Sequence, residues 1–488
     1  MSKRIIGLLL VICLCVGLLP VVALADEAEP KKVSIRILSW IDITAEEGGA
    51  IGYLKNKEYQ GLTPIYEDET IVRVEEKYKG WTQVKGSEDD WNIKLEWPKG
   101  GVPTLTLKDA KLDMMGDDGV TFCDLKTDKD TGETWYQSKG SISAILPKSG
   151  VDNRIDLNLI VEGDNLIDVN NGIVRGSVTQ TQYFKNINIT GKNGGKISGT
   201  GRGIGISARA EFPMVLDGVT LDLKPTTSGG GTPVPIRTEK ADLTIKNSNI
   251  TCANEKNVAI AAMSAGNINI IDSTINVTSR LSSTAGPGCI YAQTGTVTID
   301  GDKTNITAVG QNNACIYGGK AVIINGGDLK LTSSYYALYV TTKEAEGGQL
   351  LINGGTVEVI AERACWIAPV LGKGVVGYAG ANKENCESYD GSNVNLSRQP
   401  WMLMTNKDVD IVVTQPTENA PIFVPTTPST TATTPTQATT GNNAAPTVDA
   451  GTQTDGDNST TILLIVAAAV VLVAGAAVAV IIIKRKKA

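Results

Sequence analysis

Apolar residues alternate with polar ones over short stretches in the middle of the chain, and these stretches recur. The segments "KAVIINGGDLKL" (320–331) and "QLLINGGTVEVI" (349–360) each contain an apolar stretch, a small polar turn and a second alternating stretch. Alternation with a period of two residues is typical of strands with one buried face. No stretch between residues 99 and 405 has the apolar period of a helix. The pattern therefore predicts an all-β region.

The alternation is itself repeated. One aliphatic position recurs every 25–29 residues from Val161 onward, and a Gly, Asn or Asp stands two residues after each occurrence. These three residue types accept left-handed backbone or stabilise a tight turn. The aliphatic positions are Leu107, Val161, Ile189, Leu216, Ile245, Ile270, Ile299, Ile324 and Ile352. The turn positions are Asp109, Gly163, Gly191, Gly218, Asn247, Asp272, Gly301, Gly326 and Gly354. The gap between Leu107 and Val161 is twice the repeat, which predicts a further degenerate coil within residues 115–150.

A repeated unit of this length with about three strands predicts a right-handed parallel β-helix over residues 99–405. Each coil would stack on the previous one at about 4.8 Å. An array of β-sandwich domains is the alternative, but its hairpin turns should recur about every ten residues. Residues 26–98 lack the repeat, and we expect a small β-rich cap over the first coil. Residues 406–415 would form a final strand or exit segment.

The two ends of the chain predict export and anchoring. Residues 1–25 have the basic, apolar and small-residue order of a secretory signal peptide. Residues 416–461, rich in Thr, Pro and Ala, predict a disordered stalk. Residues 462–483 carry no charge and precede a basic tail, 484–488, which predicts a transmembrane helix with a cytoplasmic C-terminus. No Leu-Pro-x-Thr-Gly motif precedes the helix, so we expect a single-pass protein of the cell membrane whose body is extracellular.

Composition narrows the possible chemistry. The chain contains no histidine, which excludes Ser–His and Cys–His nucleophile pairs and His-ligated metals. It carries 45 Lys and Arg against 52 Asp and Glu, a negative balance that argues against a nucleic-acid partner. Asp217 and Asp272 lie at what we interpret as the same turn position and could form a carboxylate pair for glycoside hydrolysis. Gly or Asn at equivalent places favours a role in the turn instead.

A row of tyrosines is the better candidate for a binding site. Tyr291, Tyr317 and Tyr339 occupy equivalent places in successive coils, and the aliphatic residue before each is expected to point inward. The tyrosines would then point outward, where aromatic rings can stack on sugar rings. The alternative is a tyrosine stack that only stabilises the sheet face. Cys289 and Cys315 would lie beside each other on the same face and could form a disulfide, although equivalent positions in parallel strands favour reduced thiols.

An acidic loop is the candidate metal site. The segment "DLKTDKDTGE" (124–133) contains Asp124, Asp128, Asp130 and Glu133. Carboxylate-rich loops can bind Ca²⁺, although this spacing does not match an EF-hand loop. The alternative is a solvated hairpin loop. We expect no other cofactor.

The segments "WNIKLEW", "LTIKNSNIT", "VIINGGDLKLTS" and "LLINGGTVEV" give the chain a family resemblance. Over roughly residues 90–370 and the two ends, it resembles the Firmicutes surface proteins with carbohydrate-binding-domain β-helices, which are similar in shape to pectate lyases. The resemblance implies a β-helix that binds polysaccharide, in some members acidic and bridged by Ca²⁺. It transfers no catalytic residue to this sequence.

We therefore expect a non-catalytic, membrane-anchored monomer that binds extracellular polysaccharide or glycan. One alternative is a polysaccharide lyase or hydrolase with a histidine-free site of carboxylate, Arg or Lys groups. Another is a protein adhesin or a structural spacer at the cell surface.

Overall fold

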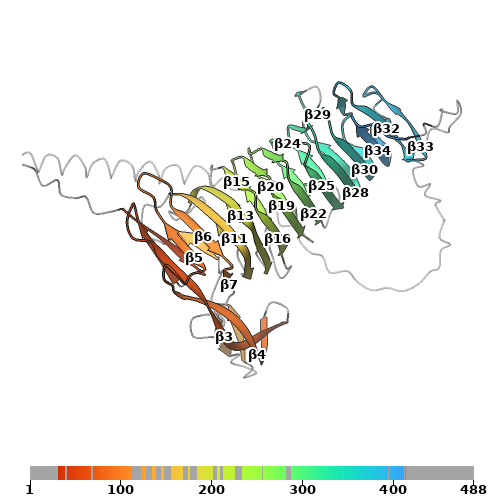
Figure 1. Cartoon of the computed structure of the whole chain (residues 1–488). Helices are drawn as coiled ribbons and strands as arrows, with labels where there is room; N and C mark the ends of the chain where they lie inside the picture. The colour runs from red at the N-terminus through yellow and green to blue at the C-terminus, as the bar shows by residue number, and fades with distance from the viewer. Residues whose placement is uncertain are drawn as a thin grey trace, which may run out of the picture. The chain divides into compact units, whose positions relative to one another are not determined.

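The computed structural model describes residues from Lys31 to Val413 (Figure 1). The residues within that range that it does not describe are 39–40, 68–69, 113–122, 128–133, 139–143, 148–154, 169–173, 176–183, 202–205, 209–212, 226–233, 255–256, 282–286, 344–345, 394 and 412. The segments expected to be signal peptide, stalk and transmembrane helix lie outside the described residues. Among the residues that are described, no helix is both long and apolar enough to cross a membrane.

The described chain is an all-β parallel solenoid of the right-handed type, as the sequence predicted, with its strands in three columns. The first column contains β6 (Thr104–Lys108), β11 (Ile155–Asp168), β13 (Phe184–Gly201), β15 (Met214–Asp217), β18 (Leu243–Lys246), β21 (Ile268–Ile271), β24 (Thr296–Asp300), β27 (Ala321–Ile324), β29 (Gln349–Ile352) and β31 (Val370–Leu371).

The second and third columns complete each coil. The second contains β7 (Lys111–Leu112), the later parts of β11 and β13, β16 (Thr220–Pro225), β19 (Asn249–Asn254), β22 (Thr274–Arg280), β25 (Asn305–Gln311), β28 (Asp328–Val340) and β30 (Thr356–Cys365). The third contains β10 (Ile145–Pro147), β12 (Val174–Arg175), β14 (Ile206–Ala208), β17 (Ile236–Thr238), β20 (Ile260–Ala262), β23 (Ile290–Ala292), β26 (Ile316–Gly318) and the ends of β28 and β30.

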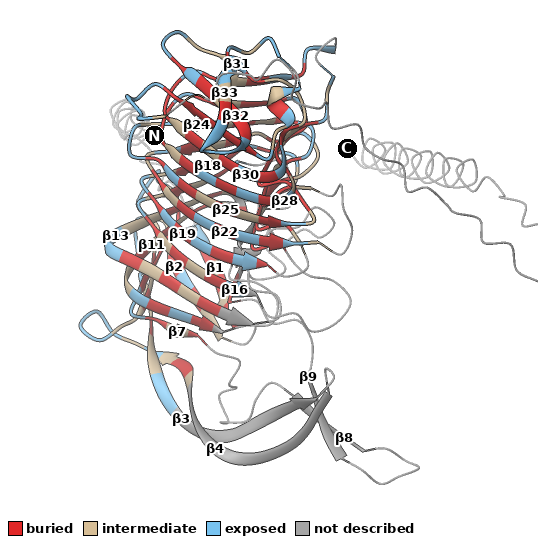
Figure 2. Cartoon of the chain, turned by 90° about the vertical axis from the view of Figure 1, so that its right-hand side faces the viewer, coloured by how far each residue is buried: buried red, intermediate tan, exposed pale blue. Residues whose placement is uncertain are grey.

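The repeated aliphatic position forms the core. From Ile189 to Ile352 the residues at this position pair in register from coil to coil, and all are fully buried. Buried and exposed positions alternate along the strands (Figure 2). One step differs from the expected alignment, because Ile189 pairs with Leu159 rather than with Val161. A shift of two residues keeps the same face inward, so the apolar pattern could not detect it.

Left-handed backbone occurs at most of the expected turn positions. Asp109, Gly163, Gly218, Asn247, Asp272 and Gly301 all have positive φ. In the three remaining coils the left-handed residue is instead Asn193, Gly327 or Gly355, one or two places later. The turn residues therefore serve the function that their chemistry predicted.

The expected hidden coil within residues 115–150 is wrong. Strand β6 pairs directly with β11, so no coil lies between them in the first column. The extra length includes β8 (Cys123–Thr127) and β9 (Thr134–Ser138), an antiparallel hairpin whose second strand pairs with β4. The insertion lies between the second and third strands of one enlarged coil, and its length matches a repeat only by coincidence.

Antiparallel strands cover both ends of the solenoid. At the start, β1 (Lys32–Ile37) pairs with β2 (Ile41–Glu46) and β3 (Gly52–Glu67) pairs with β4 (Thr70–Lys85), while β5 (Ile93–Glu96) pairs antiparallel with β6. At the other end, β32 (Val376–Asn382), β33 (Asn385–Tyr389) and β34 (Trp401–Thr405) are antiparallel, and β34 pairs with β30. Parallel pairing thus stops at β31, earlier than residue 405, because covering strands satisfy the open sheet edges.

Candidate functional site

The three tyrosines of the predicted row lie together. Tyr291 pairs with Tyr317, and Tyr317 with Tyr339, in adjacent strands of the third column. Their ring centroids are 4.9 and 5.2 Å apart. Trp366, immediately after β30, continues the row with its ring 5.0 Å from that of Tyr339. We call these four residues the aromatic ladder. The preceding aliphatic residues are buried and the ladder rings half-buried, as the alternation required.

The rings of the ladder stack mainly on one another. The planes of Tyr317 and Tyr339 differ by 9°, and those of Tyr339 and Trp366 by 23°. Ring faces at the spacing of adjacent strands leave no room for a sugar ring between them. Tyr291, at the other end, packs against the aliphatic cluster of Val234, Val258 and Ala261. The inner rings therefore stabilise this face of the solenoid, and a ligand must approach their edges or the Trp366 end of the ladder.

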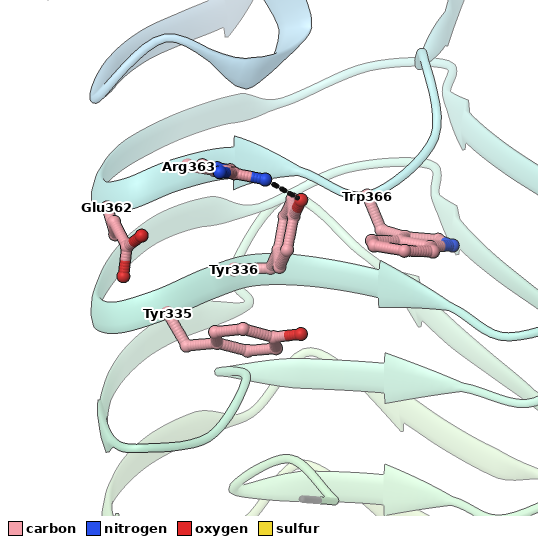
Figure 3. A pocket seen from close by; sticks show the side chains of 5 residues that line it. All are labelled: Tyr335, Tyr336, Glu362, Arg363 and Trp366. Carbon is pink, nitrogen blue, oxygen red and sulfur yellow. Dashed lines mark hydrogen bonds between the residues drawn. The ribbon is translucent and has the colours of Figure 1, made fainter. Parts of the chain in front are cut away.

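A pocket of about 160 Å³ lies at that end (Figure 3). Its lining residues are Tyr335, Tyr336, Glu362, Arg363 and Trp366. Tyr335 and Tyr336 lie on β28, whereas Glu362 and Arg363 lie on the next strand, β30. The register between β28 and β30 shifts between Ser333 and Tyr336. Such a bulge redirects side chains, which explains how two consecutive tyrosines both line one pocket.

The aromatic walls of the pocket stand at right angles. The ring of Tyr336 makes an angle of 89° with that of Tyr335 at 4.8 Å, and 84° with that of Trp366 at 5.2 Å. Tyr336 is almost fully buried, while Tyr335 and Trp366 are half-buried. The pocket therefore has a rigid aromatic lining, with Tyr336 fixed by burial.

Most hydrogen-bonding groups of the two charged residues in the pocket have no partner among the described residues. Arg363 donates one hydrogen bond from Nη1 to the Tyr336 hydroxyl at 2.8 Å, and the Arg363 guanidinium lies 5.7 Å from the Tyr336 ring. That hydrogen bond raises the pKa of Arg363. Among the described residues, neither Arg363 nor Glu362 forms an ion pair. Figure 3 shows their side chains extending in different directions.

Burial raises the pKa of several phenols in the pocket and the aromatic ladder. Loss of hydration raises the pKa of Tyr335 and of Tyr339. The same effect, with a smaller contribution from Tyr317, raises the pKa of Tyr291 to about 12. Like any phenol, these hydroxyl groups are neutral at physiological pH, and they can both donate and accept hydrogen bonds.

The candidate calcium loop lies mostly outside the described residues. Asp124 is on β8, and Asp128, Asp130 and Glu133 are in the part of the chain that is not described. Elsewhere, the described residues contain no group of three or more Cys, Asp or Glu side chains arranged to bind a metal ion. The Ca²⁺ hypothesis remains a prediction.

The alternative carboxylate pair has a structural role. Asp217 accepts a hydrogen bond from Asn247 at 3.0 Å, which lowers its pKa, and lies 3.1 Å from Lys246. Asp272 accepts from the backbone N–H of Lys303 at 3.3 Å. The expectation that the two aspartates share one turn position is wrong: the register makes Asp217 equivalent to Ile271, one residue before Asp272, and only Asp272 has left-handed backbone. Their oxygens hold turns between coils, which accounts for both residues without catalysis.

The thiols lie inside the solenoid. Cys289 and Cys315 are fully buried and unpaired, rather than on the outward face with the tyrosines. Each precedes its short strand at a corner of the coil, where the residues on both sides of it are buried too. The two-residue alternation therefore does not extend to them. Burial raises the pKa of Cys289 to about 12.

Comparison with known proteins adds no family: no protein-family model, curated protein or solved structure matches this chain. The residues that sequence reasoning missed are those of the pocket. Trp366 had a signal, because "RACWI" (363–367) aligns with "YALYV" (336–340) and places Trp366 opposite Tyr339. The same alignment places Arg363 opposite Tyr336. Tyr335 and Glu362 had no signal, since the bulge that brings them to the pocket leaves no mark in the repeat.

Proposed function

We propose that this chain is a non-catalytic binding protein that recognises an extracellular glycan at the pocket beside Trp366. The proposal is supported by one observation above all: aromatic rings, a carboxylate and a guanidinium line the same small cavity. Aromatic rings pack on the apolar faces of sugars, and a few placed polar groups fix orientation. The expected signal peptide and apolar C-terminal stretch would place this pocket outside the cell, anchored by one helix.

The size of the pocket limits what it can hold. Its volume of about 160 Å³ is below the roughly 300–1,000 Å³ of typical small-molecule sites. A single sugar ring or one substituent of a glycan fits this space, and the rest of the polymer would extend from the pocket into solvent. In this arrangement Arg363 donates to sugar oxygens and Glu362 accepts from hydroxyl groups.

The lining of the pocket favours binding over hydrolysis. Glycoside hydrolases use two carboxyl groups on either side of the bond that is cleaved. Glu362 is the one carboxylate among the described residues that line this pocket. A lone carboxylate beside an arginine on the same strand suits recognition of hydroxyl groups.

A glycan array probed with the full-length chain tests the proposal. We expect binding to a restricted set of glycans, and Tyr335→Ala should weaken it about tenfold, which corresponds to about 1.4 kcal/mol. Tyr53→Ala is the matched control, because Tyr53 is a half-buried tyrosine on β3 whose nearest ring partner is Trp91. Binding to no glycan, or equal weakening by both substitutions, would show that the pocket is not the glycan site. Retention of proteins but no sugar would favour an adhesin.

A further inference from the structure

The pocket is lined by two opposite charges that form no ion pair with each other. Glu362 and Arg363 are adjacent in sequence, both are exposed, and both line the cavity. Within the described part of the chain neither one has a salt-bridge partner, and no ion pair joins the two. A ligand with a single charge would be attracted by one of them and repelled by the other. A ligand that carries both charges, separated in space, would be attracted by both.

The aromatic rings favour a particular cation. Quaternary ammonium groups bind against the faces of several aromatic rings, because the rings' negative faces attract a charge that cannot form hydrogen bonds. Tyr335 and Trp366 are the half-buried rings of the pocket and present ring surface to a small group, whereas Tyr336 is only 2% exposed and lies under the Arg363 guanidinium. Glu362 lines the same pocket and would supply the counter-charge.

Arg363 favours a particular anion. A guanidinium has five N–H donors, and only the one bonded to Tyr336 has a partner among the described residues. The remaining donors form a planar fork that matches the oxygens of a phosphate or phosphodiester. The bond to the buried Tyr336 hydroxyl holds this fork at the edge of the pocket.

We propose that the pocket binds a zwitterionic group of the phosphocholine class, with its quaternary ammonium against Tyr335 and Glu362 and its phosphate on Arg363. The inference rests on the proposed function, since it names the substituent that the recognised glycan carries. It also explains why one small cavity contains both charges beside three aromatic rings.

Isothermal titration calorimetry of the full-length chain tests this assignment with three probes: phosphocholine, choline and inorganic phosphate. Phosphocholine should bind at least tenfold more tightly than either of its halves, because each half meets one attractive and one repulsive charge. Equal affinity for phosphocholine and for one half, or no measurable binding of phosphocholine, would overturn the proposal.

Charge-removing substitutions separate the two contacts. Arg363→Gln should weaken phosphocholine about tenfold or more, as expected for loss of hydrogen bonds to a charged group, and should strengthen choline by removing a repulsive charge. Glu362→Gln should weaken phosphocholine and choline and strengthen phosphate. The matched controls are Arg280→Gln and Glu346→Gln, exposed residues of the same solenoid that do not line the pocket. These opposite changes in preference cannot arise from misfolding, and their absence would refute the assignment.

The source of the phosphocholine group is resolved by two further probes, a phosphocholine-substituted glycan and vesicles of phosphatidylcholine. Tighter binding to the substituted glycan than to the same glycan without phosphocholine supports both proposals. Equal binding to both glycans overturns the zwitterion assignment and leaves glycan recognition standing. Binding to phosphocholine and to vesicles but to no glycan supports the pocket chemistry and overturns the glycan proposal.

Discussion

Replacing Ile270 with alanine tests whether the stacked column is the source of stability. Ile270 is fully buried in β21 and lies in register between Ile245 and Ile299 of the adjacent coils. The substitution removes three carbon atoms, which contribute about 2.4 kcal/mol at roughly 0.8 kcal/mol each. The cavity left between two coils adds to this, so we expect a loss of about 3–4 kcal/mol, within the usual range for such changes.

The neighbouring residue provides a control on the same strand. Ile271 is 36% exposed on the opposite face of β21, and Ile271→Ala should change the free energy of unfolding by less than about 0.5 kcal/mol. Both variants of the full-length chain are compared by urea unfolding, followed by circular dichroism. A loss for Ile270→Ala within about 1 kcal/mol of that for Ile271→Ala would show that the aliphatic column is not a packed core.

Three other predictions concern the turns, the thiols and the ladder. Gly301→Ala should destabilise the chain by more than about 1 kcal/mol in urea unfolding, because its φ is +85° and a Cβ would lie 2.3 Å from an Asp272 oxygen. Gly347→Ala is the control: its φ is +88° but the space around it is open, so the loss of unfolding free energy should be smaller. Cys289 should resist a thiol reagent in the native chain at pH 8 and react after unfolding. Because burial raises its pKa from 9.0 to about 12, its contribution to the free energy of unfolding should be complete below pH 9 and lost between pH 9 and about 12, as measured by urea unfolding across that range. Tyr317→Ala should reduce the free energy of unfolding by about 1–3 kcal/mol through loss of two ring contacts, while glycan affinity changes little. A fall in affinity as large as that for Tyr335→Ala would contradict the structural role of the inner rings.

The solenoid was predictable because its signals are local. Each coil repeats the same inward aliphatic residue and the same left-handed turn residue, and both can be recognised within a few residues of sequence. Asn247 and Asp272, for example, are non-glycine residues with φ of 51° and 46°, which is where short polar side chains are tolerated. Register between coils is a non-local property. The pairing of Ile189 with Leu159 preserves the buried face, so no count of apolar positions could distinguish it from the expected pairing with Val161.

The candidate site was only half predictable for a related reason. The tyrosine row follows from the repeat, since equivalent positions must stack. The pocket depends on a departure from the repeat, the bulge between Ser333 and Tyr336. Irregular backbone of this kind has no periodic signature, and it brought Tyr335 and Glu362 to the pocket, where sequence alone did not place them.

Repetition also explains why the pocket is where it is. In a stack of equivalent coils every inner side chain has a like side chain on either side, so the rings of Tyr317 and Tyr339 pack against neighbouring rings. Only where the repeat ends can a face meet something else. Among the described strands, the third column ends at Arg363 and Trp366. The next strand to pair with β30 is the antiparallel β34, and it pairs with the earlier part of β30, so no further strand extends the third column. A solenoid that binds through a stacked aromatic ladder should therefore bind at the ladder's end, and the bulge in β28 adds the polar groups that give such a site its specificity.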